Sequence, residues 1–174
     1  MILRLLLLLA CAFAPLSLLS QPPLPYKVED VTLSDLQGQS ASLPYFGKKV
    51  LFIFYIDPDT ALSGNRNIAH ADTIESSGVL CSDTIFGFGV LNLKDTFLPD
   101  RLVRSLTQRR TARNHGCVLV DSDNLLANSW QLGDCNGKFC FMIVDTSGRL
   151  VLLEKSELTD SELSELLEFV RKYW

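Results

Sequence analysis

The sequence contains little of several residue types on which common functions depend. It has only two histidines, His70 and His115, and neither stands at a metal-ligating spacing from a cysteine or an acidic residue. Basic residues number 16 against 20 acidic ones, so the net charge of −4 gives no general electrostatic basis for nucleic-acid binding. Internal repeats and low-complexity tracts are also lacking. We therefore expect no metal, no cofactor and no nucleic-acid partner.

The composition is that of a globular domain. The chain has 174 residues, of which 47% are hydrophobic and 21% are charged. This length suffices for one domain with a sizeable core and is too short for two ordinary domains. The high hydrophobic content excludes a disordered chain.

Residues 1–20 are typical of a secretory signal peptide. Arg4 is their only charged residue, residues 5–14 are apolar, and small residues then lead to Ser20. The apolar stretch is interrupted at Pro15 and is shorter than the roughly 20 residues of a spanning helix, so we expect no transmembrane helix. The predicted domain organisation is a signal peptide at 1–20, a linker at 21–27 and one domain at 28–174.

An alternative reading of this segment centres on Cys11. The preceding Leu-Leu-Ala resembles a lipobox, which would make Cys11 a lipidated N-terminus and attach the protein to a membrane. Otherwise Cys11 is a small apolar residue within the signal. We expect an exported, periplasmic protein, with a lipoprotein anchored through Cys11 as the alternative.

Strands and helices alternate along the rest of the chain. Residues 49–56 are apolar on both faces, which is typical of a central strand covered by helices on each side. A hairpin around Gly38 precedes this strand, and Thr159 with Glu162 forms a capping box at the start of the last helix. The other predicted elements are helices at 59–76, 99–113 and 124–131, strands at 84–93, 116–121 and 139–145, and a hairpin strand at 149–153. In the helix at 99–113, we expect Leu98, Leu102, Val103 and Leu106 to form one apolar side.

This order predicts an α/β fold with three layers. Alternating strands and helices produce right-handed parallel crossovers, and the closing hairpin adds antiparallel pairing. The result is a thioredoxin-like fold with a mixed central sheet, an extra αβ unit as in peroxiredoxins and TlpA-type thioredoxins, and a C-terminal ββα.

One segment carries a more specific resemblance. The matching positions are Asp121 after a strand, Trp130 in Trp-Gln-Leu, and Asp145, Gly148 and Arg149 after a buried strand. This pattern is similar to that of the YtfJ-like periplasmic proteins, an uncharacterised group with a thioredoxin-like fold. The likeness covers roughly residues 27–172 in element order, and its motifs lie in residues 118–150. It implies the fold and the compartment, and it implies no activity.

The chain departs from redox-active thioredoxins at two places. Those proteins carry a Cys-x-x-Cys motif directly after the central strand, where a helix N-terminus lowers the thiol pKa. Here Asp57, Asp59 and Thr60 occupy that place, and it contains no sulfur. Phe139 stands where those proteins have a cis-proline, and we expect a trans peptide bond before it because a non-proline cis bond costs about 3 kcal/mol.

Four cysteines besides Cys11 would reach the oxidising compartment, and spacing alone permits three pairings. In the topology implied above, Cys81 and Cys117 lie at one end of the sheet, and Cys135 and Cys140 flank a loop at the opposite end. We therefore predict the disulfides Cys81–Cys117 and Cys135–Cys140. Three interpretations remain open, namely structural disulfides, a displaced redox couple at Cys135–Cys140, and free buried thiols.

Two further patterns suggest weaker alternatives. Asp57-x-Asp59 after a strand resembles the phosphoryl-acceptor motif of haloacid dehalogenases, although Thr60 falls one position too early for that motif. Together with Asp121 and Asp123, the Asp57 and Asp59 residues could also place two acidic pairs at one edge of the sheet, where they could hold a divalent cation or simply cap helices.

A set of arginines in the helix at 99–113 could bind an anionic partner or form a solvated face; these are Arg101, Arg104, Arg109, Arg110 and Arg113.

Taken together, these observations favour an exported thioredoxin-like protein without the usual redox motif. The leading interpretation is a non-redox binding or accessory module with an unknown partner protein in the cell envelope. The alternative is a thiol–disulfide oxidoreductase that uses Cys135 and Cys140.

Overall fold

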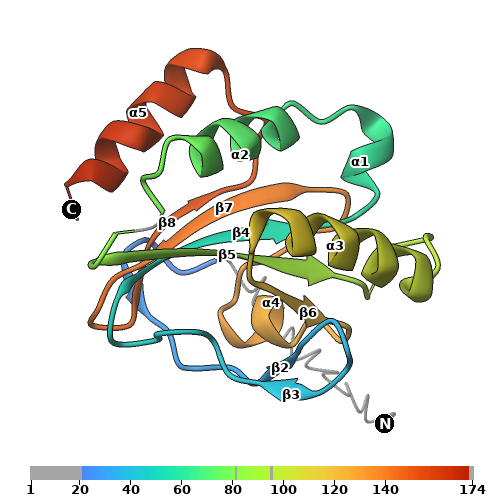
Figure 1. Cartoon of the computed structure of the whole chain (residues 1–174). Coiled ribbons are helices and arrows are strands. Elements are labelled where there is room, and N and C mark those ends of the chain that lie inside the picture. Colours follow the sequence, from blue (N-terminus) through green and yellow to red (C-terminus); the bar gives the residue numbers. More distant parts are fainter. Residues whose placement is uncertain (1–20, 81, 95, 173–174) are drawn as a thin grey trace, which may run out of the picture.

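The computed structural model describes residues 21–80, 82–94 and 96–172. The predicted signal peptide, Cys11 and Cys81 lie outside these residues. Helices and strands alternate as the sequence predicts (Figure 1). In chain order the elements are β1 (Tyr26–Lys27), β2 (Leu33–Ser34), β3 (Ser40–Ala41), β4 (Val50–Ile56), α1 (Thr60–Ser63), α2 (Asn67–Ser76), β5 (Ile85–Asn92), α3 (Asp100–Asn114), β6 (Val118–Asp121), α4 (Leu125–Ser129), β7 (Phe139–Val144), β8 (Arg149–Glu154) and α5 (Asp160–Arg171).

A single mixed sheet organises the fold. Its strand order is β1-β8-β7-β4-β5-β6-β2-β3. Strands β4, β5 and β6 are parallel, whereas β7 runs antiparallel to β4 and β8 runs antiparallel to β7. The expected hairpin around Gly38 is present as β2 and β3, in shorter form. Strand β1 pairs with β8 and lies inside the segment expected to be a linker.

Helices cover both faces of the sheet (Figure 1). On one face, α2 and α5 pack over alternate side chains of the central strands, among them Phe52 and Phe54 of β4. On the other face, α4 packs over Ile53 and Tyr55. Because β4 is buried on both faces, it lacks the polar alternation of a half-exposed strand.

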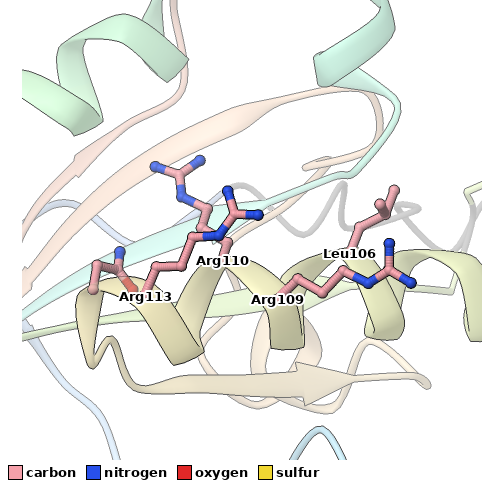
Figure 2. Close-up of a pocket in the computed structure, with 5 residues that line it drawn as sticks. Leu106, Arg109, Arg110 and Arg113 are labelled. Carbon is pink, nitrogen blue, oxygen red and sulfur yellow. The ribbon is translucent and has the colours of Figure 1, made fainter.

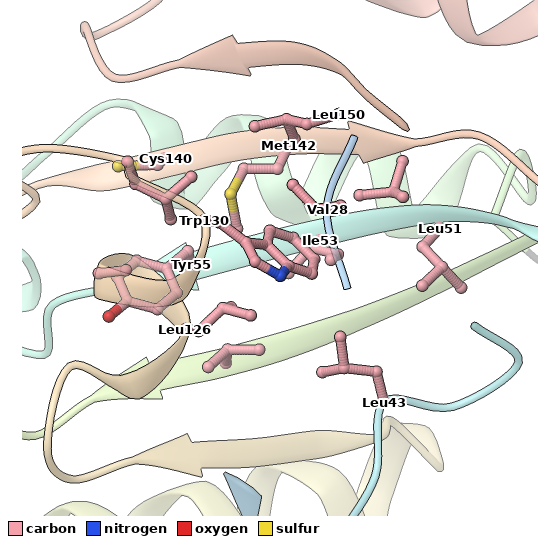
Figure 3. Close-up of a cluster of buried hydrophobic side chains, with 14 of the residues drawn as sticks. Val28, Leu43, Leu51, Ile53, Tyr55, Leu126, Trp130, Cys140, Met142 and Leu150 are labelled. Carbon is pink, nitrogen blue, oxygen red and sulfur yellow. The ribbon is translucent and has the colours of Figure 1, made fainter. Parts of the chain in front are cut away.

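Trp130 is the largest side chain of the α4 core, which Figure 3 shows with Tyr55 and Cys140 among aliphatic side chains. Only 1% of its surface is exposed, and its indole Nε1 donates to the carbonyl of Glu29 at 2.8 Å. The hydroxyl of Tyr26 in turn donates to the Trp130 carbonyl at 2.6 Å. Trp130 therefore anchors the N-terminal segment to the sheet.

The prediction for the helix at 99–113 is partly wrong. The helix forms as α3, but Leu102 and Leu106 are 48% and 55% exposed, and Val103 is its one buried residue. The helix packs on the sheet through Val103, which joins a small cluster with Leu91 and Val120, whereas Leu80 and Val118 cover Gly87 and Gly89 of β5. The helix predicted at 59–76 is likewise interrupted, because Gly64 ends α1 with a φ of 69°.

Asn67 at the start of α2 is fully buried and joins three segments. Its amide donates to the carbonyls of Phe139, at 3.0 Å, and Ser156, at 2.8 Å. Its side-chain oxygen accepts from the amide of Leu158 at 2.9 Å. The side chain thus fixes the start of β7 against the loop that leads into α5.

We predict that Asn67→Ala lowers the free energy of unfolding by about 2–4 kcal/mol, because it leaves buried backbone groups without partners. Urea denaturation followed by circular dichroism measures this change. The matched control is Asn128→Ala, an exposed position in α4 that should change stability by no more than about 0.5 kcal/mol. Equal effects of the two substitutions would contradict the role given to Asn67.

Candidate thiol site at the sheet edge

The site is built where β4 and β7 meet the carboxyl edge of the sheet. Cys140 is the second residue of β7 and pairs in register with Tyr55 of β4. Cys135 lies in the loop before β7, and both cysteines belong to the core beneath α4. They are 4% and 0% exposed.

The two cysteine side chains lie in the same buried core, each shifts the pKa of the other, and both are present as thiols. The structure therefore brings together the pair that the sequence analysis singled out. The disulfide between them stays a prediction. Cys117 is also a thiol, half-buried at the opposite end of β6. Its predicted partner Cys81 lies outside the described residues.

The environments of Cys135 and Cys140 differ. The hydrogen bond from Cys140 lowers the pKa of Cys135, and the positive charges of Lys155 and Lys138 lower it further against the opposing effect of burial. The same hydrogen bond, together with burial, raises the pKa of Cys140. These opposite directions favour ionisation of Cys135 over ionisation of Cys140.

Both lysines are held in place by the loop that contains Cys135. The Lys138 ammonium donates to the backbone carbonyl and to the carboxylate of Asp134, each at 2.9 Å. This carboxylate raises the pKa of Lys138 and keeps it charged. Lys155, next to the end of β8, donates to the carbonyl of Leu132. The sequence reasoning missed both lysines, because neither is close to Cys135 in a recognisable motif.

Asp57 occupies the place where redox-active thioredoxins carry sulfur. It is fully buried, and its two carboxylate oxygens accept backbone N–H groups, one from Asp59 at 2.9 Å and one from Gly137 at 2.6 Å. The Asp57 amide also donates to the Lys138 carbonyl at 2.9 Å. Asp57 thereby ties the loop after β4 to the loop that carries Cys135.

The other acidic residues do not join Asp57 in a cluster. Asp59 accepts from the Thr96 hydroxyl and the Phe97 amide. Asp121 is fully buried and accepts from the first two amides of α4, so it caps that helix. Its Oδ2 also accepts from the Tyr55 hydroxyl at 3.0 Å, and burial together with this carboxylate raises the pKa of Tyr55. Within the described segments no group of three His, Cys, Asp or Glu could hold a metal ion.

The remaining residues of the YtfJ-like sequence motif, which are Asp145, Gly148 and Arg149, lie in or next to the turn between β7 and β8. Asp145 accepts from the amides of Ser147 and Arg149, which closes the turn between β7 and β8. Gly148 in that turn has a φ of 70°, and a Cβ there would lie 3.4 Å from the Val28 carbonyl oxygen. Arg149 is exposed and reaches the Pro25 carbonyl. These positions shape the fold rather than the thiol site.

The structure also shows the peptide bond before Phe139 and the positions of the two histidines. The single cis peptide bond of the described residues joins Leu24 and Pro25, so the bond before Phe139 is trans as expected. His70 is buried in α2 beside the Leu158 carbonyl, and His115 is exposed at the end of α3.

A small polar pocket of about 80 Å³ lies beside Cys135. The side of α4 contributes Ala127 and Asn128, and the loop before β7 contributes Asp134 and Asn136. Asn92 at the end of β5 completes the wall. Through this pocket Cys135 has a polar opening that Cys140 lacks.

Comparison with known proteins gives no family for this chain. No family model matches the sequence, and no curated protein matches it. No described helix is long and apolar enough to cross a membrane.

Solved structures show clear similarity in three dimensions. The exposed lipoprotein thioredoxin Etrx1 of Streptococcus pneumoniae superimposes with a TM-score of 0.61 at 14% identity, over 83% of this chain and 99% of that one. The thioredoxin domain of a thiol-disulfide oxidoreductase from Bacteroides vulgatus gives 0.54 at 16% identity, over 83% and 96%. A peroxiredoxin-like protein from Aquifex aeolicus gives 0.53 at 9% identity, over 83% and 85%. The chain therefore has a thioredoxin-like fold.

Proposed function

We propose that this protein is an exported thiol redox protein whose reversible dithiol–disulfide couple is Cys135–Cys140. The observation that carries the proposal is that two buried thiols lie in one core beneath α4, Cys135 in the loop before β7 and Cys140 on β7 itself. Each thiol shifts the pKa of the other, and the loop between them contains Gly137, so we expect the two sulfurs to reach disulfide distance. This couple would take the role of the Cys-x-x-Cys motif, whose position is occupied here by Asp57.

The chemistry follows from the different surroundings of the two thiols. The Cys135 thiolate attacks one sulfur of an external disulfide, the bond between its sulfurs breaks, and the second sulfur leaves as a thiolate. Cys140 then attacks the Cys135 sulfur of this mixed disulfide, and its proton is transferred to the departing thiolate. The products are the Cys135–Cys140 disulfide, one external thiolate and one external thiol, so two electrons pass from the two cysteines to the external disulfide.

The compartment belongs to the same proposal. The signal-like residues 1–20 and the likeness to YtfJ-like periplasmic proteins support an exported location, with attachment through Cys11 as the alternative. In an oxidising compartment the couple would rest as the disulfide and be reduced by a partner.

The first prediction concerns the reduction potential. We expect the Cys135–Cys140 couple to titrate reversibly near −200 mV, within the range of known oxidoreductases. The measurement is thiol trapping with mass mapping in glutathione redox buffers, equilibrated from both the oxidised and the reduced protein. Cys140→Ser should abolish the intramolecular couple, and Cys117→Ser should leave it unchanged because Cys117 lies at the other end of β6. Resistance to reduction below roughly −300 mV would identify a structural disulfide and reject the proposal.

The second prediction concerns the pH dependence of alkylation. In the reduced protein, iodoacetamide should modify Cys135 with a midpoint below the ordinary thiol pKa of about 8.5. Lys155→Met should raise this midpoint, because loss of a nearby positive charge disfavours the thiolate. Lys48→Met, at an exposed position, is the matched control and should leave the midpoint unchanged. A Lys155→Met profile identical to that of the control would show that Lys155 does not stabilise the thiolate.

A second candidate function, a non-redox binding module, is favoured by the surface of α3 (Figure 2). An open groove of about 470 Å³ is lined by Leu106, Arg109, Arg110, Arg113 and Asn114. Arg110 pairs with Asp72 of α2, whereas Arg109 and Arg113 form no ion pair within the described part of the chain. Exposed arginines beside an exposed leucine suit an acidic protein segment that also carries apolar side chains.

This candidate predicts salt-dependent binding of acidic peptides. A fluorescein-labelled peptide of alternating glutamate and leucine should bind, and Arg109→Glu with Arg113→Glu should weaken binding at least about tenfold. Fluorescence anisotropy at low and high salt measures the affinity, and Arg171→Glu on the distant α5 is the control. No difference between the control and the double variant would eliminate the groove as a docking site. Preferential binding to vesicles containing anionic phospholipid would point to a membrane instead of a protein.

A further inference from the structure

We propose that the Asn136–Gly137 step is a deamidation site, that the Asp57 carboxylate holds it in an unreactive form, and that its product places a new carboxylate beside Cys135. The consequence for Cys135 rests on the proposed function, whereas the deamidation itself does not. Neither the sequence motifs nor the structural similarities assign a modification to this loop.

The sequence of the loop carries the first part of the argument. Asn136–Gly137 is the one asparagine–glycine step in the chain. A glycine has no Cβ to shield its nitrogen, so the side chain of the preceding asparagine can approach that nitrogen closely. Both residues are exposed, and the Asn136 side chain forms no hydrogen bond with the part of the chain that the structure describes.

The reaction needs only water as a second reactant. The Gly137 nitrogen attacks the side-chain carbonyl carbon of Asn136 and loses its proton to the solvent, so a carbon–nitrogen bond forms and closes a succinimide ring. The bond from this carbon to the side-chain nitrogen breaks, and that nitrogen takes a proton from the solvent and leaves as ammonia. Water then opens the ring at either carbonyl and gives aspartate or isoaspartate at position 136. The net reaction consumes one water and releases one ammonia.

The folded conformation of the loop opposes ring closure. The Lys138 amide donates to the Cys135 carbonyl at 3.3 Å and closes a turn. Gly137 has a φ of 63°, whereas Asn136 is not among the residues with a positive φ, as in a type II turn. The residue before the glycine is extended in such a turn. Ring closure requires rotation about its Cα–C bond until the Gly137 nitrogen eclipses the Asn136 Cβ, so the turn must first open.

The Asp57 carboxylate opposes the reaction in a second way. Its Oδ2 accepts the Gly137 N–H at 2.6 Å, and this is the proton that the attacking nitrogen must lose. A buried negative charge beside that nitrogen disfavours its deprotonated form. Opening of the loop, which exchange with a protein disulfide would require, removes both constraints. Deamidation would therefore accumulate with the number of openings.

The product changes the charge around Cys135. Asn136 follows Cys135 in the chain, and both line the same pocket. The carboxylate of Asp134, on the other side of Cys135 in the chain, already acts to raise the pKa of that thiol. A carboxylate at position 136 acts in the same direction, so deamidation would leave less of the thiol ionised.

The first experiment measures deamidation of the full chain, kept reduced at mildly alkaline pH. Peptide mapping by mass spectrometry quantifies aspartate and isoaspartate at each asparagine, with and without denaturing urea. We expect Asn136 to react at least about tenfold more slowly in the folded chain than in urea, because the reaction waits for local opening. An equal rate in the folded chain and in urea, or no reaction at Asn136 in urea, would overturn the inference.

Asp57→Asn tests the carboxylate directly. It should accelerate deamidation of Asn136 in the folded chain at least about fivefold, because the neutral amide holds the Gly137 N–H more weakly. Asp59→Asn is the matched control, since it removes a carboxylate of the same loop that binds Thr96 and Phe97 instead. Equal rates at Asn136 in the two variants would show that Asp57 does not protect the site.

Asn128 in α4, which is exposed and precedes a serine, reports on global unfolding. If Asp57→Asn accelerates deamidation of Asn128 as well, the variant is unfolded, and the unaltered chain in urea below its unfolding transition takes its place. Such urea should accelerate the reaction at Asn136 and not at Asn128, because the loop opens before the helix does. Parallel acceleration of both residues there would reject local opening as the cause.

Asn136→Asp reproduces the charge of the product. In the reduced protein, it should raise the pH midpoint for alkylation of Cys135 by iodoacetamide. Asn114→Asp makes the same change of charge at an exposed residue at the end of α3, and it should leave the midpoint unchanged. A midpoint in Asn136→Asp equal to that of the control would refute the consequence for Cys135 and with it the inference.

The outcomes also separate this inference from the function on which it rests. Deamidation is followed by mass and does not require a couple that cycles. A couple that titrates reversibly, without faster deamidation in Asp57→Asn than in its control, rejects the inference and keeps the redox function. A couple that resists reduction in the redox buffers rejects the redox function and leaves the deamidation result as measured.

Discussion

The buried carboxylate of Asp57 is the contact on which the thiol site depends. A carboxylate inside a protein is costly unless its oxygens are hydrogen-bonded, and here the backbone amides of Asp59 and Gly137 satisfy them. Because these amides belong to two different loops, the same bonds that stabilise the carboxylate also fix the loop of Cys135 against the end of β4. At the position where a redox-active thioredoxin carries its cysteines, this protein has Asp57, and the Asp57 carboxylate holds the loop that carries Cys135 in place.

This displacement changes how a thiolate is stabilised. In the usual arrangement the N-terminus of a helix provides free amides and a partial positive charge. Cys135 lies in a loop and has no such helix, so its support comes from the Cys140 thiol and from Lys155 and Lys138. These charges are on flexible side chains, and the hydrogen bonds of Lys155 to the Leu132 carbonyl and of Lys138 to the carbonyl and carboxylate of Asp134 hold them near the sulfur.

The sequence predicts the sheet well because its strands carry strong local signals. Residues 49–56 are apolar on both faces, and Thr159 with Glu162 forms the expected capping box. The apolar side assigned to α3 is partly wrong because periodicity does not show how much of a helix the sheet covers, and the small cluster around Val103 leaves Leu102 and Leu106 exposed. The proximity of Cys135 and Cys140 was predictable from the topology, whereas the position of Lys155 near Cys135 required the β8 register to be known.

Burial would separate the potential of the proposed Cys135–Cys140 couple from its reactivity. The potential depends on the relative free energies of the dithiol and the disulfide, which the hydrogen bond and the nearby lysines influence. The rate of each exchange depends on which reactants reach Cys135, and that is limited by a pocket of about 80 Å³. A protein substrate would require the loop before β7 to open, which breaks the bond between Gly137 and Asp57. The same contact that assembles the site therefore also limits access to Cys135.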